Sequence, residues 1–155
     1  MRNIQNCNSC WNEIKDIKDI NDFMERFGWF SDSCLKELHL WTEHFVEKDL
    51  SMAISPNLDC KIKVLFQRQD TNPSAIEMLF EQVTRVNIIP SPENYDSIIF
   101  SATLISIDGT FYWADDEAWK PDDPSKYAVS WISSKKIKWR DVSEWMGAEL
   151  RYGSI

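Results

Sequence analysis

From Cys34 onward, apolar residues recur at every second position, and no helical pattern lies between consecutive apolar runs. Alternation at period two is typical of half-buried antiparallel strands. Two parallel strands need a crossover connection of roughly a dozen or more residues, usually a helix, and these runs leave no room for one. The chain is therefore expected to be mainly β and antiparallel.

Seven or eight strands separated by short turns follow from this pattern. Asp108 and Gly109 lie between two apolar, β-rich runs, and this dipeptide predicts a tight hairpin. A curved antiparallel sheet, a sandwich and a barrel all accommodate such a pattern. The expected strands cover residues 38–40, 50–54, 62–66, 76–80, 98–107, 110–114, 127–133 and 135–140.

One N-terminal helix is expected to pack on a face or an end of this sheet. Apolar residues from Trp11 to Phe27 recur at spacings of three and four, and Gly28 follows as a C-cap. Asp16 or Asp19 would cap a shorter helix. The C-terminal tail, residues 142–150, is expected to form one helical turn or two.

The 155 residues fit one domain, 1–155, with no linker or repeat. A formal net charge of -8 repels nucleic acids and anionic membranes, and it favours basic protein partners or simply solubility. The apolar runs are too short to cross a bilayer, and no signal peptide is recognisable at the N-terminus. These features predict a cytoplasmic protein that binds neither nucleic acid nor membranes.

The four cysteines are expected to be thiols in that compartment. Cys7 and Cys10 form a single C-x-x-C, whereas zinc would need two further ligands at a suitable spacing. No metal and no cofactor is therefore expected. The two histidines, His39 and His44, lie on opposite faces of a regular strand, and no nucleophile or phosphate-binding motif is recognisable, so no catalytic residue is assigned.

The densest acidic segment follows the predicted hairpin and contains one tryptophan, Trp119, which is expected to be exposed. Exposed tryptophans ringed by charge are typical of protein interfaces. Calcium binding, general acid–base chemistry and a merely solvated loop are the alternatives. The candidate binding residues are Asp115, Asp116, Glu117, Trp119, Asp122 and Asp123.

A basic run follows, with Lys136, Lys138 and Arg140 on one face of a strand and Ile137 and Trp139 on the other. Lysine-rich strands commonly protect the edge of a sheet against aggregation. An edge strand is therefore expected here rather than a nucleic-acid-binding surface.

The run from Phe27 to Arg140 resembles small uncharacterised bacterial domains. The resemblance is carried by Phe30–Cys34, Val64–Gln69, Asp108–Asp115 and Trp131–Lys136. In size and acidity the chain is similar to immunity proteins, which bind and block a partner toxin. The resemblance implies a non-enzymatic protein-binding module, an inhibitor of a basic toxin, and assigns no residue roles. The alternative is a small enzyme or ligand-binding domain whose site is assembled from scattered carboxylates and aromatics.

Overall fold

The described residues, 10–123 and 128–153, form one α-helix, a 3-10 turn and nine strands in this computed structural model. All strand pairs are antiparallel, so the expectation of a mainly β fold with one N-terminal helix is confirmed. The elements are β1 (Asn12–Ile14), α1 (Ile17–Arg26), η1 (Gly28–Phe30), β2 (Ser33–Trp41), β3 (Phe45–Val46), β4 (Met52–Ala53), β5 (Lys61–Arg68), β6 (Ala75–Asn87), β7 (Thr103–Ile107), β8 (Thr110–Ala114) and β9 (Trp131–Asp141).

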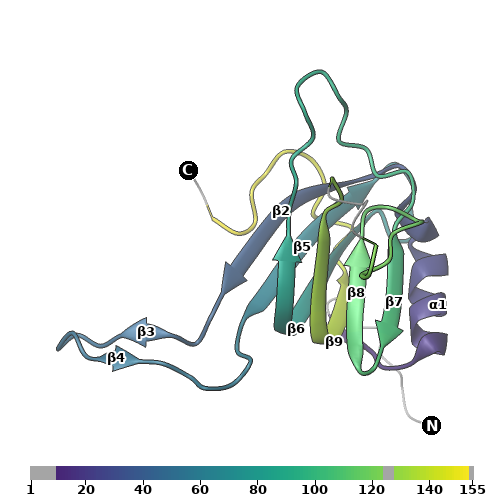
Figure 1. The fold of residues 1–155 in the computed structure, drawn as a ribbon. Coiled ribbons are helices and arrows are strands. Elements are labelled where there is room, and N and C mark those ends of the chain that lie inside the picture. The colour runs from purple at the N-terminus through teal and green to yellow at the C-terminus, as the bar shows by residue number, and fades with distance from the viewer. Residues whose placement is uncertain (1–9, 124–127, 154–155) are drawn as a thin grey trace, which may run out of the picture.

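Seven of the strands form one curved sheet in the order β2-β5-β6-β9-β8-β7, with β1 also paired to β9 (Figure 1). The sheet is not closed into a barrel, because β2 and β7 stand at the two ends of this order. One hydrogen bond connects the two ends of the sheet: the Ile99 N–H donates to the Ser33 carbonyl at 2.8 Å. The segment before β7 thereby reaches the first residue of β2.

The helix α1 is shorter than the apolar spacing predicts. Its N-terminus is capped by Asp16, whose carboxylate accepts a hydrogen bond from the Asp19 N–H at 2.9 Å. The cap satisfies an N–H that has no partner within the helix. The residues before Asp16 instead form β1, in which Ile14 pairs with Ile137 of β9. Of the two caps considered, Asp16 is therefore confirmed.

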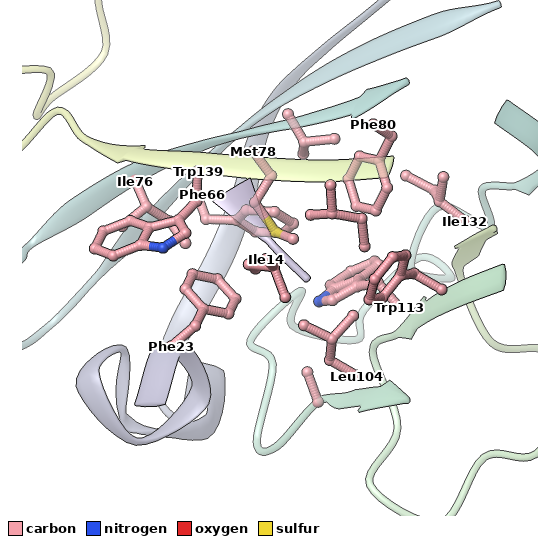
Figure 2. Close-up of a cluster of buried hydrophobic side chains, with 14 of the residues drawn as sticks. Ile14, Phe23, Phe66, Ile76, Met78, Phe80, Leu104, Trp113, Ile132 and Trp139 are labelled. Atoms are coloured by element: carbon pink, nitrogen blue, oxygen red, sulfur yellow. The ribbon is translucent and has the colours of Figure 1, made fainter. Parts of the chain in front are cut away.

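The main hydrophobic core lies between α1 and the sheet, as Figure 2 shows. The ring of Phe23, on α1, lies 5.3 Å from that of Trp139 on β9. The ring of Phe30 lies 5.0 Å from that of Phe66 on β5, and Trp113 is fully buried beside them. Burial of apolar area at roughly 25 cal/mol per Å² makes this layer the main source of stability.

The predicted hairpin is confirmed between β7 and β8. Ile107 pairs with Thr110, which leaves Asp108 and Gly109 as the two turn residues. Both have positive φ, +50° and +77°, as a type I′ turn requires. The dipeptide thus sets the register of the two strands.

The opposite face of the sheet carries a buried ion pair beneath the C-terminal tail. Glu77 on β6 is fully buried, and it accepts hydrogen bonds from Arg140 Nε at 2.8 Å and from the Tyr152 hydroxyl at 2.6 Å. The backbone N–H of Tyr152 also donates to the Glu37 carboxylate of β2. These bonds hold residues 142–153 as a strap of turns across the sheet, so the predicted helical turns are wrong.

The basic run is not at an edge of the sheet, so that prediction is also wrong. The two strands expected at 127–133 and 135–140 are replaced by one continuous strand, β9, which begins only at Trp131 and lies between β6 and β8. Its cations face carboxylates on β6: Arg140 binds Glu77, and Lys138 Nζ lies 2.8 Å from Glu81. Cross-strand charge pairing therefore explains the basic residues.

Two apolar runs that were expected to form half-buried strands lie mostly outside the strands of the structure. In the first, β4 covers only Met52 and Ala53, and Met52 is 67 % exposed. In the second, residues 98–102 precede β7, and Phe100 is 74 % exposed. The first run lies off the main sheet, because β3 and β4 pair only with each other. The second run is held to the start of β2 by Ile99, and there Ile99 and Ala102 enter the main core while Ile98 and Phe100 are exposed.

The cysteines do not all remain thiols. Cys10 is disulfide-bonded, whereas Cys34 and Cys60 are free and half-buried; Cys7 lies outside the described residues. The prediction of four thiols is thus wrong at Cys10, because it rested only on the compartment inferred from the sequence. No helix within residues 10–123 and 128–153 has the length and apolar character needed to cross a membrane.

Candidate functional site

The predicted acidic loop begins directly after β8, and its first residue is tied to the segment that enters β9. The Asp115 N–H donates to the Ser130 carbonyl at 3.0 Å, and Asp115 Oδ1 accepts from the Ser130 N–H at 3.0 Å. Ser130 Oγ accepts from the Ile89 N–H at 2.9 Å. The start of the loop is therefore anchored to two other segments and is not simply solvated.

This anchoring perturbs the acidity of Asp115. Burial raises the pKa of its carboxyl; the Ser130 N–H opposes that effect, and the neighbouring charge of Asp116 adds to it. A raised pKa means that the fold disfavours the ionised carboxylate. A positive charge placed beside Asp115 by a partner would lower this pKa, so such binding would favour release of a proton.

Asp116 shapes the turn that follows. Its Oδ1 accepts from the Ala118 N–H at 2.8 Å, and its carbonyl accepts from the Thr103 hydroxyl at 2.8 Å. An aspartate that bonds the backbone two residues ahead is a typical turn former. The turn is thereby docked on β7.

Trp119 is buried, which contradicts its predicted role as an exposed anchor. Only 4 % of the residue is exposed, and its ring lies 5.1 Å from that of Trp131 and 6.0 Å from that of Tyr112. The loop folds back on β8 and β9 because an indole has more apolar area to bury than any other side chain in this segment. Trp119 therefore belongs to a small core with Ala114 and Val129.

Three of the predicted carboxylates meet around one hollow. This surface, called the acidic hollow below, has a volume of about 370 Å³. Its carboxylates stand beside Phe100, which is 74 % exposed. The acidic hollow is lined by Ile98, Phe100, Ser101, Asp115, Asp116, Glu117, Ala128 and Val129.

The other two acidic residues lie outside the acidic hollow. Asp122 is exposed and Asp123 is half-buried, with the Asp123 N–H donating to the Lys120 carbonyl at 3.2 Å. The structure thus brings together Asp115, Asp116 and Glu117 but does not add Asp122 and Asp123 to them.

Comparison of the chain with protein-family models, curated proteins and solved structures found no significant match. The functional argument therefore rests on the site alone.

Phe100 and Ile98 are the site residues that sequence reasoning missed. Both were assigned to the buried face of a long strand because they alternate with their neighbours. The available signal was the preceding segment, which contains Pro90 and Pro92 and interrupts any regular strand. A short extended segment between a proline-rich loop and a strand can expose the face that a sheet would cover.

The histidines lie far from the acidic hollow in the sequence and serve local roles. The His39 ring stacks on Trp41 at 5.1 Å, whereas His44 Nδ1 accepts from the Ser55 N–H and its Nε2 lies 3.3 Å from Asp59. Within the part of the chain that the structure describes, no group of three histidine, cysteine or acidic side chains is placed to hold a metal ion.

Proposed function

We propose that the protein is a non-enzymatic module that binds a basic protein, as an immunity protein binds and blocks its toxin. The observation that carries the proposal is the position of Phe100, which is 74 % exposed and lines the acidic hollow together with Asp115, Asp116 and Glu117. The cytoplasm, which the sequence predicts, is part of the same proposal.

The aromatic and the acidic residues of the acidic hollow would act at different steps of binding: the aromatic in the bound complex and the acidic residues during the encounter. A large aromatic that becomes buried is a typical hot spot, and its truncation costs on the order of 2 kcal/mol of binding free energy. Carboxylates such as Asp116 and Glu117, on a chain with net charge -8, accelerate encounter with a basic surface, and salt weakens that acceleration. Phe100 takes the role that Trp119 was expected to have.

The test compares variants as baits in the lysate of cells that express the protein. Phe100→Ala should lose a basic partner that the parent retains, while Ile17→Ala, which shortens a side chain 75 % exposed on α1, should retain it. With that partner purified, Phe100→Ala should mainly speed dissociation, and Glu117→Lys should mainly slow association. Equal recovery and equal rates for all baits would place the interface elsewhere.

A ligand-binding domain is the second candidate, and one observation favours it. Asp115 also lines a second hollow, of about 260 Å³, together with Trp113, Leu35 and Ser130. It is a little smaller than typical small-molecule pockets of roughly 300–1,000 Å³. Native mass spectrometry of freshly purified protein tests this candidate: a bound small molecule lost in Asp115→Ala would support it over protein binding.

A further inference from the structure

The second hollow is built from segments that lie far apart in the sequence. Leu35 belongs to β2 and Trp113 to β8, two strands that are not neighbours in the sheet. Half of the lining comes from the connection between β6 and β7, residues 88–102. This connection reaches β2 through Ile99 and then continues into β7, so the second hollow lies where the two ends of the open sheet are linked.

Hydrogen bonds fix two points of this connection. Ser130 Oγ accepts from the Ile89 N–H at 2.9 Å and donates to the Ile89 carbonyl at 3.3 Å. Ten residues further on, the Ile99 N–H donates to the Ser33 carbonyl at 2.8 Å. Ser130 and Ile99 are both buried. The second hollow is therefore bounded by segments that the fold already holds in place.

Most of the lining is apolar, and part of it is exposed to water. Trp113 is fully buried, whereas Ile88 and Ile89 are 38 % and 41 % exposed. An apolar group that entered the second hollow would remove such surface from water, which is favourable. Small-molecule pockets typically combine walls of this kind with few polar groups. The apolar lining residues are Leu35, Ile88, Ile89, Pro90, Ile99 and Trp113.

The charge of the lining determines which polar group a ligand should carry. Asp115 is the one charged residue among the ten described residues that line the second hollow, and the other polar ones are serines. Asp115 Oδ1 accepts from the Ser130 N–H, and the ion pairs of the described residues do not include Asp115. An anionic ligand would find no positive side chain in this lining, whereas a cation would find a carboxylate that lacks one.

The surroundings of Asp115 strengthen its attraction for a cation. Asp115 is half-buried, so water screens its charge less than it screens an exposed carboxylate. Trp113 lies in the same lining, and indole is the aromatic group whose ring face attracts cations most strongly. We propose that the second hollow binds a compact primary amine, whose ammonium group pairs with Asp115 and whose apolar body packs against Ile89 and Trp113. This inference rests on the second candidate function above and names the chemistry of its ligand.

The test compares phenethylamine, 2-phenylethanol and phenylacetate, which carry a cationic, a neutral and an anionic group on the same kind of aromatic body. Binding is followed by NMR through the Nε1–H of Trp113, which has no acceptor among the described residues and whose resonance Trp113→Phe identifies. Phenethylamine at up to millimolar concentrations should shift this resonance saturably. 2-Phenylethanol should bind about tenfold or more weakly, because a charge-assisted hydrogen bond is lost, and phenylacetate should not bind.

Two variants test the role of Asp115. Asp115→Asn keeps an acceptor for the Ser130 N–H but removes the charge, so it should weaken phenethylamine about tenfold or more and leave 2-phenylethanol unchanged. Glu117→Gln is the matched control: it removes a charge from the acidic hollow, does not line the second hollow, and should leave the affinity for phenethylamine unchanged.

Three results would overturn the proposal: no saturable shift with phenethylamine, equal affinities for the amine and the alcohol, or an amine that binds Asp115→Asn as tightly as the parent. A small molecule retained in native mass spectrometry, together with any of these results, would keep the ligand-binding candidate and remove the amine. Phe100→Ala should bind phenethylamine like the parent, which separates this result from the test of the acidic hollow.

Discussion

The guanidinium of Arg140 holds the fully buried carboxylate of Glu77 at 2.7 Å across the β6–β9 pair. The same guanidinium lies over two indoles, 4.6 Å from the ring centroid of Trp11 and 5.3 Å from that of Trp145. The Tyr152 hydroxyl completes the set by donating to the second oxygen of Glu77. One ion pair therefore joins the N-terminal segment, the centre of the sheet and the C-terminal strap.

Glu77→Ala should lower the free energy of unfolding by about 3–5 kcal/mol, because it leaves the Arg140 charge uncompensated. Equilibrium urea denaturation measures the change. Glu77→Leu combined with Arg140→Met should lose less, since neither charge remains. Lys18→Ala removes an ion pair with Asp22 on the exposed face of α1 and should have no measurable effect. A Glu77→Ala protein as stable as Lys18→Ala would show that the buried pair contributes nothing.

Asp115→Asn should leave the protein as stable as the parent at pH 7, or more stable. The carboxamide oxygen can still accept from the Ser130 N–H, and the variant no longer ionises a group whose pKa burial raises. As pH rises, the Asp115 carboxyl ionises near 3.8 in the unfolded chain and at a higher pH in the folded one. The stability of the parent therefore falls between these two pKa values and stays lower at every pH above them.

Unfolding free energies of both proteins between acidic and neutral pH measure this difference. Asp115→Ala is the control: it also removes the charge but loses the hydrogen bond, which should cost about 1 kcal/mol. An asparagine variant that is destabilised as much as the alanine variant would contradict the role assigned to burial.

Gly109→Val should destabilise the domain by more than the roughly 1–2 kcal/mol that an ordinary side chain costs in the left-handed conformation. A Cβ at Gly109 would meet no atom within 4 Å, so the effect isolates the φ of +77°. Thermal unfolding measures it. Gly109→Asn should cost less, because asparagine tolerates positive φ. Equal melting of the valine variant and the parent would rule out the type I′ turn.

Trp119→Ala should destabilise the domain by about 3–5 kcal/mol, as expected for truncating a buried aromatic. The sequence alone predicted the opposite, a loss of binding in a folded protein. Phe100→Ala should show that behaviour instead, with almost unchanged urea denaturation. If Trp119→Ala and Phe100→Ala have the same free energy of unfolding, Trp119 is not buried in solution.

The sequence predicts the main fold well because its strongest signals are local. The Asp108–Gly109 turn and the Asp16 cap depend on neighbouring residues, and both are confirmed. Period-two alternation also finds most of the strands of the main sheet, although it is wrong for most of residues 50–54 and 98–102. The open edges of the sheet and the place of β9 within it depend on pairing between distant segments, which no local pattern encodes.

In the candidate site, too, the features that depend on neighbouring residues were predicted, and those that depend on distant segments were not. Asp115, Asp116 and Glu117 are consecutive, and they do line one hollow. The side chain that stands beside them, Phe100, comes from another segment and was misassigned. Alternation shows which side chains share a face, but not whether anything covers that face, so Phe100 and Met52 were expected inside while Trp119 was expected outside.

The position of β9 also bears on how the chain folds during synthesis. Among the described strands it is made last, yet it fills the middle of the sheet, between β6 and β8, and it also pairs with β1. A nascent chain that ends before Trp131 has two separate sets of strands, each with an unpaired edge and half of the future core facing water. Such species are prone to aggregate. Productive folding of this sheet must therefore wait until β9 has been synthesised, and any truncation that removes β9 takes away the strand that joins the two half-sheets.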